Sequence, residues 1–239
     1  TWPSPANVVE ISGADSVMVD INSDDFCINV NKIEESITKK TKAIIVVHEF
    51  GQSADIGKIM TLAQTNNLKV IEDSACAIGT EFKGKKVGTF GDIGCFSFHP
   101  RKIVTTGEGG ALVTNDDELA KKLRSYRNHG MVQEKGNLDF HYPGLNYRLT
   151  EFQAVLGVHQ MRVLDKIIRN RIKLANKYYD QLAGLSWLRL PDSLKDRKHV
   201  YQTFHVMLSR EKSREKLIDY LKVNNIETNL GAQALPRLK

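Results

Sequence analysis

Two continuous apolar runs flank one amphipathic segment in the first part of the chain. Residues 42–47 (KAIIVV) predict a strand buried on both faces, and residues 69–71 predict a second one. Between them, residues 55–67 repeat apolar side chains at helical spacing, namely Ile56, Ile59, Met60 and Ala63. Strand, helix and strand at this spacing predict right-handed βαβ units in a mostly parallel sheet.

Weaker periodicity predicts the remaining elements. We expect helices at 1–13, 31–38, 117–128, 150–164, 166–182 and 214–224, and strands at 16–21, 95–98, 111–114, 188–190, 201–208 and 226–229. Residues 129–148 have no clear period and are predicted to form a long loop, which inside a compact domain is commonly functional or disordered. The order of elements predicts a large α/β domain at 1–150, connecting helices at 151–183 and a small α+β unit at 184–239.

Composition and charge narrow the function classes. The 239 residues are 41% hydrophobic and 26% charged, which is ordinary globular usage. The net charge of +6 is spread along the chain without the interleaved aromatics of a nucleic-acid-binding surface, and no apolar run approaches the ~20 residues of a membrane helix. The three cysteines lack paired or metal-binding spacing, which argues against a zinc site or a disulfide framework and favours a reducing, cytoplasmic compartment.

Three polar side chains in residues 69–110 point to a cofactor site. Asp73 follows a strand, Ser97 lies on the next predicted buried strand, and Lys102 follows it in a turn before a Thr/Gly cluster. Pyridoxal phosphate (PLP) needs a carboxylate for its pyridine nitrogen, hydroxyl and amide donors for its phosphate, and an amine for its aldehyde. Taken singly, Asp73 is more often a helix cap or loop acid, and Lys102 is by default a surface lysine.

Four blocks of sequence carry a resemblance to a known family: HEFGQSADI (48–56), EDSACAIG (72–79), GDIGCFSFHPRKIVTTGEGG (91–110) and GLNYRLTEFQAVLG (144–157). In this order they resemble the PLP-dependent nucleotide-sugar aminotransferases of the DegT/DnrJ/EryC1/StrS family. The resemblance implies an α/β fold of the aspartate-aminotransferase type (fold type I), with a PLP-binding large domain and part of a small α+β C-terminal domain. Compared with the family, we expect both ends of the chain to be truncated.

The same resemblance assigns roles to individual residues. Lys102 is expected to bind the cofactor aldehyde covalently and move protons, Asp73 to keep the pyridine nitrogen protonated, and Ser97 to donate to the phosphate. Trp2 is expected to stack on the ring, although without the resemblance a frayed terminal tryptophan is the better interpretation. The expected cofactor-binding residues are Trp2, Asp73, Ala75, Cys76, Ser97, Lys102 and Asn146.

Two segments bear on partners. In the family, the segment that matches Asn146 reaches the cofactor phosphate of a neighbouring subunit, so we expect a homodimer with shared active sites. Arg148 fits either that role or an ion pair within its own fold. His48, at the end of a strand, fits a ligand contact or a structural loop histidine.

The implied reaction is transfer of an amino group, with glutamate as the usual donor, to a keto group of a nucleotide-linked sugar, in surface-polysaccharide or aminosugar biosynthesis. One departure is Cys76, which replaces the usual Gln or His near the ring hydroxyl and is a poor hydrogen-bond donor. Dehydration of a sugar, amination of a cyclitol and a non-catalytic structural or regulatory role remain alternatives. A generic nucleotide-binding domain lacks support, because no phosphate-binding glycine motif follows a strand.

Overall fold

The computed structural model describes residues 1–134, 136–192 and 194–235. Its helices are α1 (Ser4–Ile11), α2 (Val30–Ser36), the 3-10 turn η1 (Glu49–Gly51), α3 (Ile56–Thr65), α4 (Asp117–Arg127), α5 (Glu151–Arg162), α6 (Leu164–Leu182) and α7 (Arg214–Val223). Its strands are β1 (Ala43–Val47), β2 (Lys69–Asp73), β3 (Glu81–Phe82), β4 (Lys85–Lys86), β5 (Ile93–Ser97), β6 (Gly110–Val113), β7 (Met131–Glu134), β8 (Asn137–Phe140), β9 (Leu188–Arg189), β10 (Arg197–Lys198) and β11 (Met207–Leu208).

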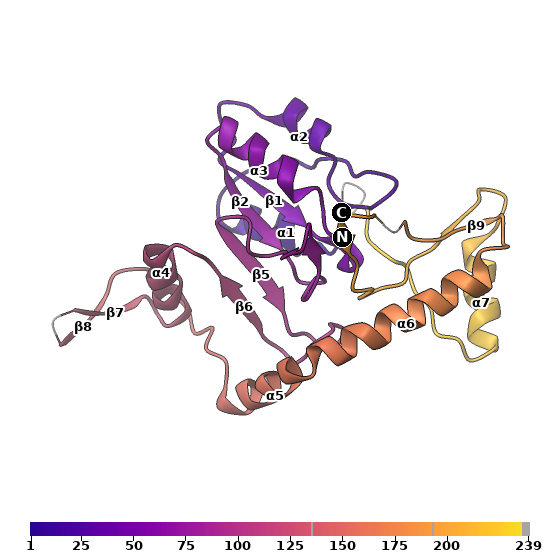
Figure 1. Cartoon of the computed structure of the whole chain (residues 1–239). Coiled ribbons are helices and arrows are strands. Elements are labelled where there is room, and N and C mark those ends of the chain that lie inside the picture. The colour runs from indigo at the N-terminus through magenta and orange to yellow at the C-terminus, as the bar shows by residue number, and fades with distance from the viewer. Residues whose placement is uncertain (135, 193, 236–239) are drawn as a thin grey trace.

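A four-stranded sheet in the order β1-β2-β5-β6 forms the centre of the molecule (Figure 1). β1, β2 and β5 run parallel, and β6 runs antiparallel to β5. The register pairs Val47 with Asp73 and Asp73 with Cys95, so β1 and β2 end level with each other and β5 continues at the same edge to Ser97. The predicted α/β class with a mostly parallel sheet is therefore confirmed.

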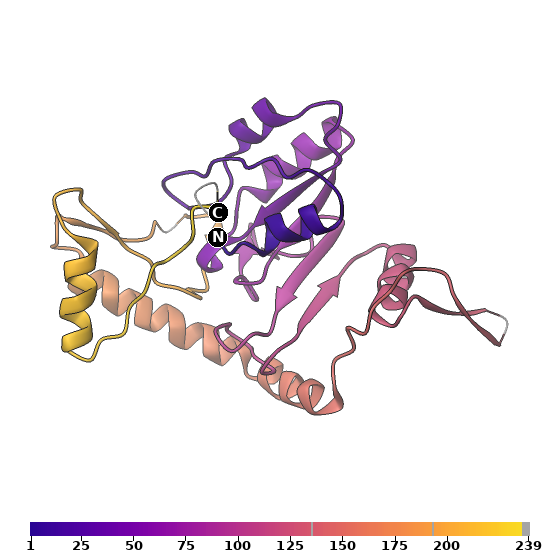
Figure 2. The same cartoon turned by 180° about the vertical axis from the view of Figure 1, so that it is seen from behind.

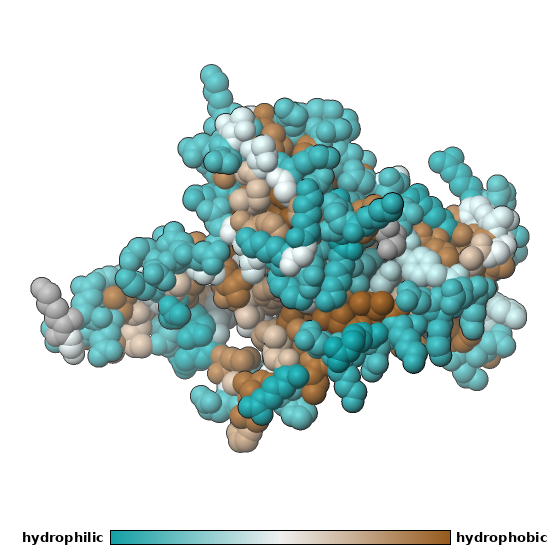
Figure 3. All heavy atoms as spheres, viewed as in Figure 1, coloured by the Kyte–Doolittle hydropathy of each residue, from teal (hydrophilic) through white to brown (hydrophobic). Residues whose placement is uncertain are grey.

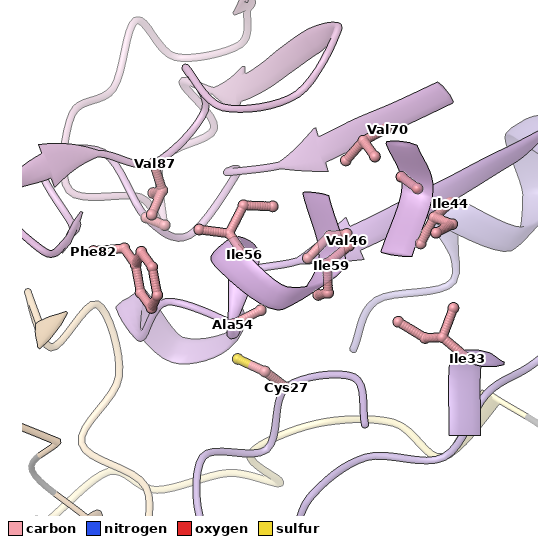
Figure 4. Packing of buried hydrophobic residues seen from close by; sticks show 12 residues of the cluster. Cys27, Ile33, Ile44, Val46, Ala54, Ile56, Ile59, Val70, Phe82 and Val87 are labelled. Carbon is pink, nitrogen blue, oxygen red and sulfur yellow. The ribbon is translucent and has the colours of Figure 1, made fainter. Parts of the chain in front are cut away.

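The main core forms where α2 and α3 pack against this sheet. β1 and β2 alternate buried and less buried residues, and Ile44, Val46 and Val70 point into the same cluster (Figure 4). α3 contributes Ile56 and Ile59 because the predicted helical spacing places both on one face. α1 lies on the other side of the sheet, as a comparison of Figures 1 and 2 shows.

The C-terminal part packs on a smaller core. α6 is a long helix that runs from beneath the sheet to β9 and α7 (Figure 1). Its Ile168 joins Val200 and two residues of the β5–β6 connection, Ile103 and Val104, in a second buried cluster. The connection that carries Lys102 is thereby anchored between the sheet, α6 and the C-terminal segment. The division into three domains stays a prediction.

Two secondary-structure predictions, a strand at 16–21 and a loop at 129–148, were wrong for the same reason. Residues 16–21 alternate apolar and polar side chains but form no strand, and only Ile21 makes an isolated bridge, to Ile28. Residues 129–148, predicted as a loop, contain the β7–β8 hairpin, which projects away from the sheet (Figure 1). A strand requires a hydrogen-bonding neighbour, and local periodicity does not show whether one is present.

Two further strand predictions were wrong toward the C-terminus. In 201–208 only Met207 and Leu208 are in a strand, where they pair with β9, and 226–229 form none. Residues 201–206 and 226–229 pair with no strand among the described residues, although Tyr201 and His205 are buried. Among the described residues, no helix is long and apolar enough to cross a bilayer.

Candidate functional site

Backbone hydrogen bonds shape the connection between β5 and β6 into a compact loop. The Lys102 amide donates to the His99 carbonyl (2.9 Å), and the Thr106 amide donates to the Phe98 carbonyl (3.0 Å). Immediately after Lys102, Ile103 and Val104 are buried in the second core cluster. The lysine therefore starts from a fixed point of the backbone, as expected for a side chain that must meet a cofactor.

The Lys102 amine reaches the turn that follows β2. Its Nζ donates a hydrogen bond to Cys76 Sγ over 3.0 Å, and both side chains are partly buried. Burial raises the pKa of the Cys76 thiol, while the positive charge and hydrogen bond of Lys102 act in the opposite direction. The amine thus lies beside the segment that begins with Asp73.

Asp73 and Ser97 end neighbouring strands at the same edge of the sheet. Asp73 Oδ1 accepts a hydrogen bond from the Ala75 amide (3.0 Å), which orients the carboxylate at the end of β2. Ser97 is the last residue of β5, and its Oγ accepts a hydrogen bond from the His99 amide (3.3 Å). The structure therefore brings the acid, the hydroxyl and, through Cys76, the lysine to one edge.

Two predicted site residues lie apart from this group. Trp2 is 67% exposed, just before α1, and takes part in none of the hydrogen bonds or ring contacts between described residues. Asn146 forms an isolated bridge with Asn128 at the end of α4, and its Oδ1 accepts a hydrogen bond from the Arg148 amide (3.3 Å). Arg148 donates to Asn128 Oδ1 (2.6 Å). The cofactor roles of Trp2 and Asn146 stay predictions.

A buried pair beside the site was not predicted to act together. His48 Nε2 and Glu72 Oε2 lie 3.0 Å apart, and both side chains are fully buried. His48 Nδ1 accepts a hydrogen bond from the Ala54 amide, so Nε2 is the protonated nitrogen that donates to Glu72. With both nitrogens used inside the fold, His48 is structural. The burial of Glu72 could have been predicted from strand alternation, because Glu72 lies two residues after buried Val70 and therefore faces the same side of the sheet.

Two glutamine side chains bind the backbone of the β5–β6 connection on either side of Lys102. No local sequence pattern predicted these contacts. Gln160 of α5 exchanges two hydrogen bonds with the backbone of Thr105, accepting over 3.1 Å and donating over 2.8 Å. Gln202 donates to the Arg101 carbonyl over 3.0 Å. Contacts of this kind join residues that are far apart in sequence, so only the folded chain identifies them.

The residues present match the polar groups of PLP. Lys102 offers an amine, Asp73 a carboxylate and Ser97 a hydroxyl at one sheet edge, and these are the partners that the aldehyde, pyridine nitrogen and phosphate require. Ser74, next to Asp73, is fully buried, and its Oγ has no hydrogen-bond partner among the described residues. The donor set fits PLP. Within the described residues, no cluster of three or more His, Cys, Asp or Glu could hold a metal ion.

Sequence comparison identifies the family. Residues 1–234 match the DegT/DnrJ/EryC1/StrS aminotransferase family profile. The chain belongs to this family. The family is PLP-dependent, which confirms the cofactor class that the resemblance implied.

Individual relatives of known name agree with this family. The chain is 39% identical over 233 residues to GDP-perosamine synthase of Caulobacter vibrioides, covering 95% of this chain and 62% of that protein. It is 42% identical over 212 residues to UDP-N-acetyl-3-dehydro-alpha-D-glucosamine 3-aminotransferase of Acidithiobacillus ferrooxidans, covering 87% of this chain and 56% of that protein. The chain thus spans about 60% of the length of these DegT/DnrJ/EryC1/StrS proteins.

A solved sugar aminotransferase structure supports the fold. The Streptococcus pneumoniae protein Spr1654 has been solved in a PLP form and a PMP form. Both forms superpose on the whole of this chain, with TM-scores of 0.92 and 0.93 at 25% identity, and the match covers 66% and 67% of the respective Spr1654 chains. The expectation of an aminotransferase-type α/β fold over part of the family's length is confirmed.

Proposed function

We propose that this protein transfers an amino group, with PLP as cofactor and glutamate as donor, to a keto group of a nucleotide-linked sugar. The observation that carries the proposal is the contact between the Lys102 amine and the turn after β2, because it joins the only lysine of the β5–β6 connection to the segment of Asp73. The names of the two relatives, one acting on a GDP-linked and one on a UDP-linked sugar, support the substrate class.

Each site residue has a chemical task in this proposal. When bound, PLP supplies an electron sink for the carbon that gains or loses the amino group. Lys102 Nζ would hold the cofactor through its amine and would serve as the base that carries a proton to and from the substrate carbon. Asp73 keeps a proton on the pyridine nitrogen, and Ser97 donates its hydroxyl hydrogen to the phosphate.

The remaining residues position the ring. The Ala75 amide orients the Asp73 carboxylate, and Cys76, which contacts the Lys102 amine, would lie near the ring hydroxyl. Trp2 would stack on the ring, for which its exposed indole is available. Lys102 supplies the amine that amino transfer requires, which favours that reaction over the alternatives.

Absorbance and peptide mapping test the assignment of Lys102. Purified protein mixed with PLP should develop a near-visible band, borohydride should abolish it, and mass spectrometry should then place the pyridoxyl group on Lys102. Lys102→Ala should lose the band, while Lys58→Ala, at an exposed position of α3, should keep it. A wild-type protein without the band would contradict the enzymatic proposal and favour the non-catalytic alternative. An aminated rather than dehydrated sugar product would separate the two reactions.

We also propose that α5 packs against a second copy of the chain. α5 has a complete capping box at Thr150 but no buried residue, and Phe152 is 91% exposed. Apolar side chains gather over this helix at the lower edge of Figure 3. An exposed apolar helix of this kind is typical of an interface. Because the expected Asn146 contact crosses between subunits, the same interface would complete the cofactor site.

Oligomeric state tests this interface directly. Phe152→Glu should convert a dimer to a monomer in sedimentation experiments, whereas Tyr220→Glu, at an exposed position of α7, should not. Mixing Lys102→Ala protein with Asn146→Ala protein should restore PLP attachment at one site of each hybrid dimer. If Asn146 acted within its own subunit, both sites of the hybrid would remain defective.

A further inference from the structure

The cofactor lysine has a sulfur atom as its hydrogen-bond partner. Lys102 Nζ and Cys76 Sγ lie 3.0 Å apart, and neither atom has another hydrogen bond among the described residues. All three cysteines are free, but the other two differ from Cys76. Cys27 is fully buried, and Cys95 makes no side-chain hydrogen bond in the described part of the chain. Cys76 alone of the three is paired with an amine.

We propose that a peroxide converts Cys76 and Lys102 into a reversible sulfur–nitrogen cross-link. In the first step the Cys76 thiol is oxidised to a sulfenic acid, and the peroxide is reduced to water. In the second step the lone pair of Lys102 Nζ attacks the sulfur, the S–N bond forms, and the sulfenic oxygen leaves as a second water. The sum is one thiol, one amine and one hydrogen peroxide giving one sulfenamide and two waters.

The geometry favours this second step over the competing fates of a sulfenic acid. The amine is already in contact with the sulfur, and the flexible stem of lysine lets Nζ close the remaining gap without backbone movement. The nucleophile is therefore held at high effective concentration. Excess thiol reverses the product, because thiolate attack on the sulfur releases the amine and leaves a disulfide that a second thiol reduces.

The cross-link consumes the same amine that PLP needs. Oxidation and cofactor attachment are therefore mutually exclusive, and the pair acts as a redox gate on PLP loading. This consequence rests on the proposed function, but formation of the cross-link does not, because it needs only the chain and the peroxide. The two can fail separately.

The charges around the pair predict how the reaction depends on pH. Burial raises the pKa of Cys76, Lys102 lowers it, and Glu49 of η1 and Asp73 of β2 raise it. The Cys76 thiolate, the form that peroxide oxidises, becomes more abundant as pH rises. The cross-link should therefore form faster at pH 9 than at pH 7. Because the pKa of Cys76 is raised rather than lowered, the selectivity for Cys76 over the other cysteines comes from its contact with the Lys102 amine.

Peptide mapping locates the cross-link. Chain without cofactor is treated with hydrogen peroxide, the remaining thiols are blocked, and the protein is digested with trypsin. Cys76 lies on peptide 70–83, Cys95 on 87–101, and Lys102 begins the next peptide. We expect peptide 70–83 to be joined to a peptide that starts at Lys102. The mass of the joined species should be lower than the sum of the two peptides by two hydrogen atoms. Dithiothreitol should separate the two peptides again. Cys76→Ser and Lys102→Arg should abolish the joined species, while Cys95→Ser should keep it.

A second arm measures the gate. PLP at a concentration 100-fold above its dissociation constant should slow cross-linking about 100-fold, since only about 1% of the lysine stays free. Oxidised chain should take up no borohydride-stable pyridoxyl label until dithiothreitol is added. The proposal is overturned if peroxide leaves 70–83 unjoined or oxidises Cys76 only to the irreversible acids. It is also overturned if Cys76→Ser still gives the joined species.

Discussion

Replacing Glu72 with glutamine should destabilise the fold by about 3–6 kcal/mol. The Glu72 carboxylate is fully buried and accepts four hydrogen bonds: from Gly88, Phe90 and Gly91 amides at 2.7 Å each, and from His48 Nε2 at 3.0 Å. Two donors face each oxygen. In Glu72→Gln the amide nitrogen replaces one oxygen, so two buried donors lose their acceptor whichever way the amide turns. Each lost bond to a buried charged group is worth about 1.5–3 kcal/mol.

Urea denaturation of the variant and the wild type measures this loss. Glu34→Gln on the exposed side of α2 is the matched control, and it should leave the denaturation midpoint unchanged. A loss of less than about 1 kcal/mol in Glu72→Gln would refute the view that this carboxylate pins the 88–91 turn to the sheet.

The pH dependence gives an independent readout. Burial raises the pKa of Glu72, but the hydrogen bonds from His48 and the backbone outweigh it and hold that pKa below its ordinary value. The unfolded chain therefore binds the proton more readily, and this stabilisation is present above about pH 4.5 and lost as pH falls through the folded value. Glu72→Gln should lack that part of the acid sensitivity.

Two further predictions concern stability. Burial lowers the pKa of His205 from 6.5 to about 4, so stability should fall as pH drops from 6.5 towards 4. His205→Phe keeps a ring between Phe26 and Phe50 and should flatten that slope in urea midpoints measured against pH; an unchanged slope would be evidence against His205. A Cβ at Gly94 would overlap the Gly88 backbone, so Gly94→Ala should cost more than about 2 kcal/mol, whereas Gly184→Ala, with open space around it, should be tolerated. Equal unfolding free energies for these two variants would contradict the packing argument.

Local periodicity predicted the central elements well. The apolar runs at 42–47 and 69–71 became β1 and β2, and the helical spacing at 55–67 became α3, because a strand or helix buried in a core must repeat its apolar positions with its own period. The same rule failed at 16–21, where alternation occurs without a neighbouring strand to complete the hydrogen bonds. It also missed the β7–β8 hairpin, whose strands are only four residues each and largely exposed, which is too short a run to establish a period.

The sequence by itself determined the family and the cofactor class, because contiguous motifs carry both. The same motifs predicted Lys102, Asp73 and Ser97 as site residues. The tertiary structure decided which atoms meet. Lys102 contacts Cys76 across 26 positions, Gln160 holds Thr105 across 55, and Glu72 joins a turn 16 to 19 residues away. Such contacts depend on strand order, register and loop path, and none of these is encoded in the spacing of neighbouring residues.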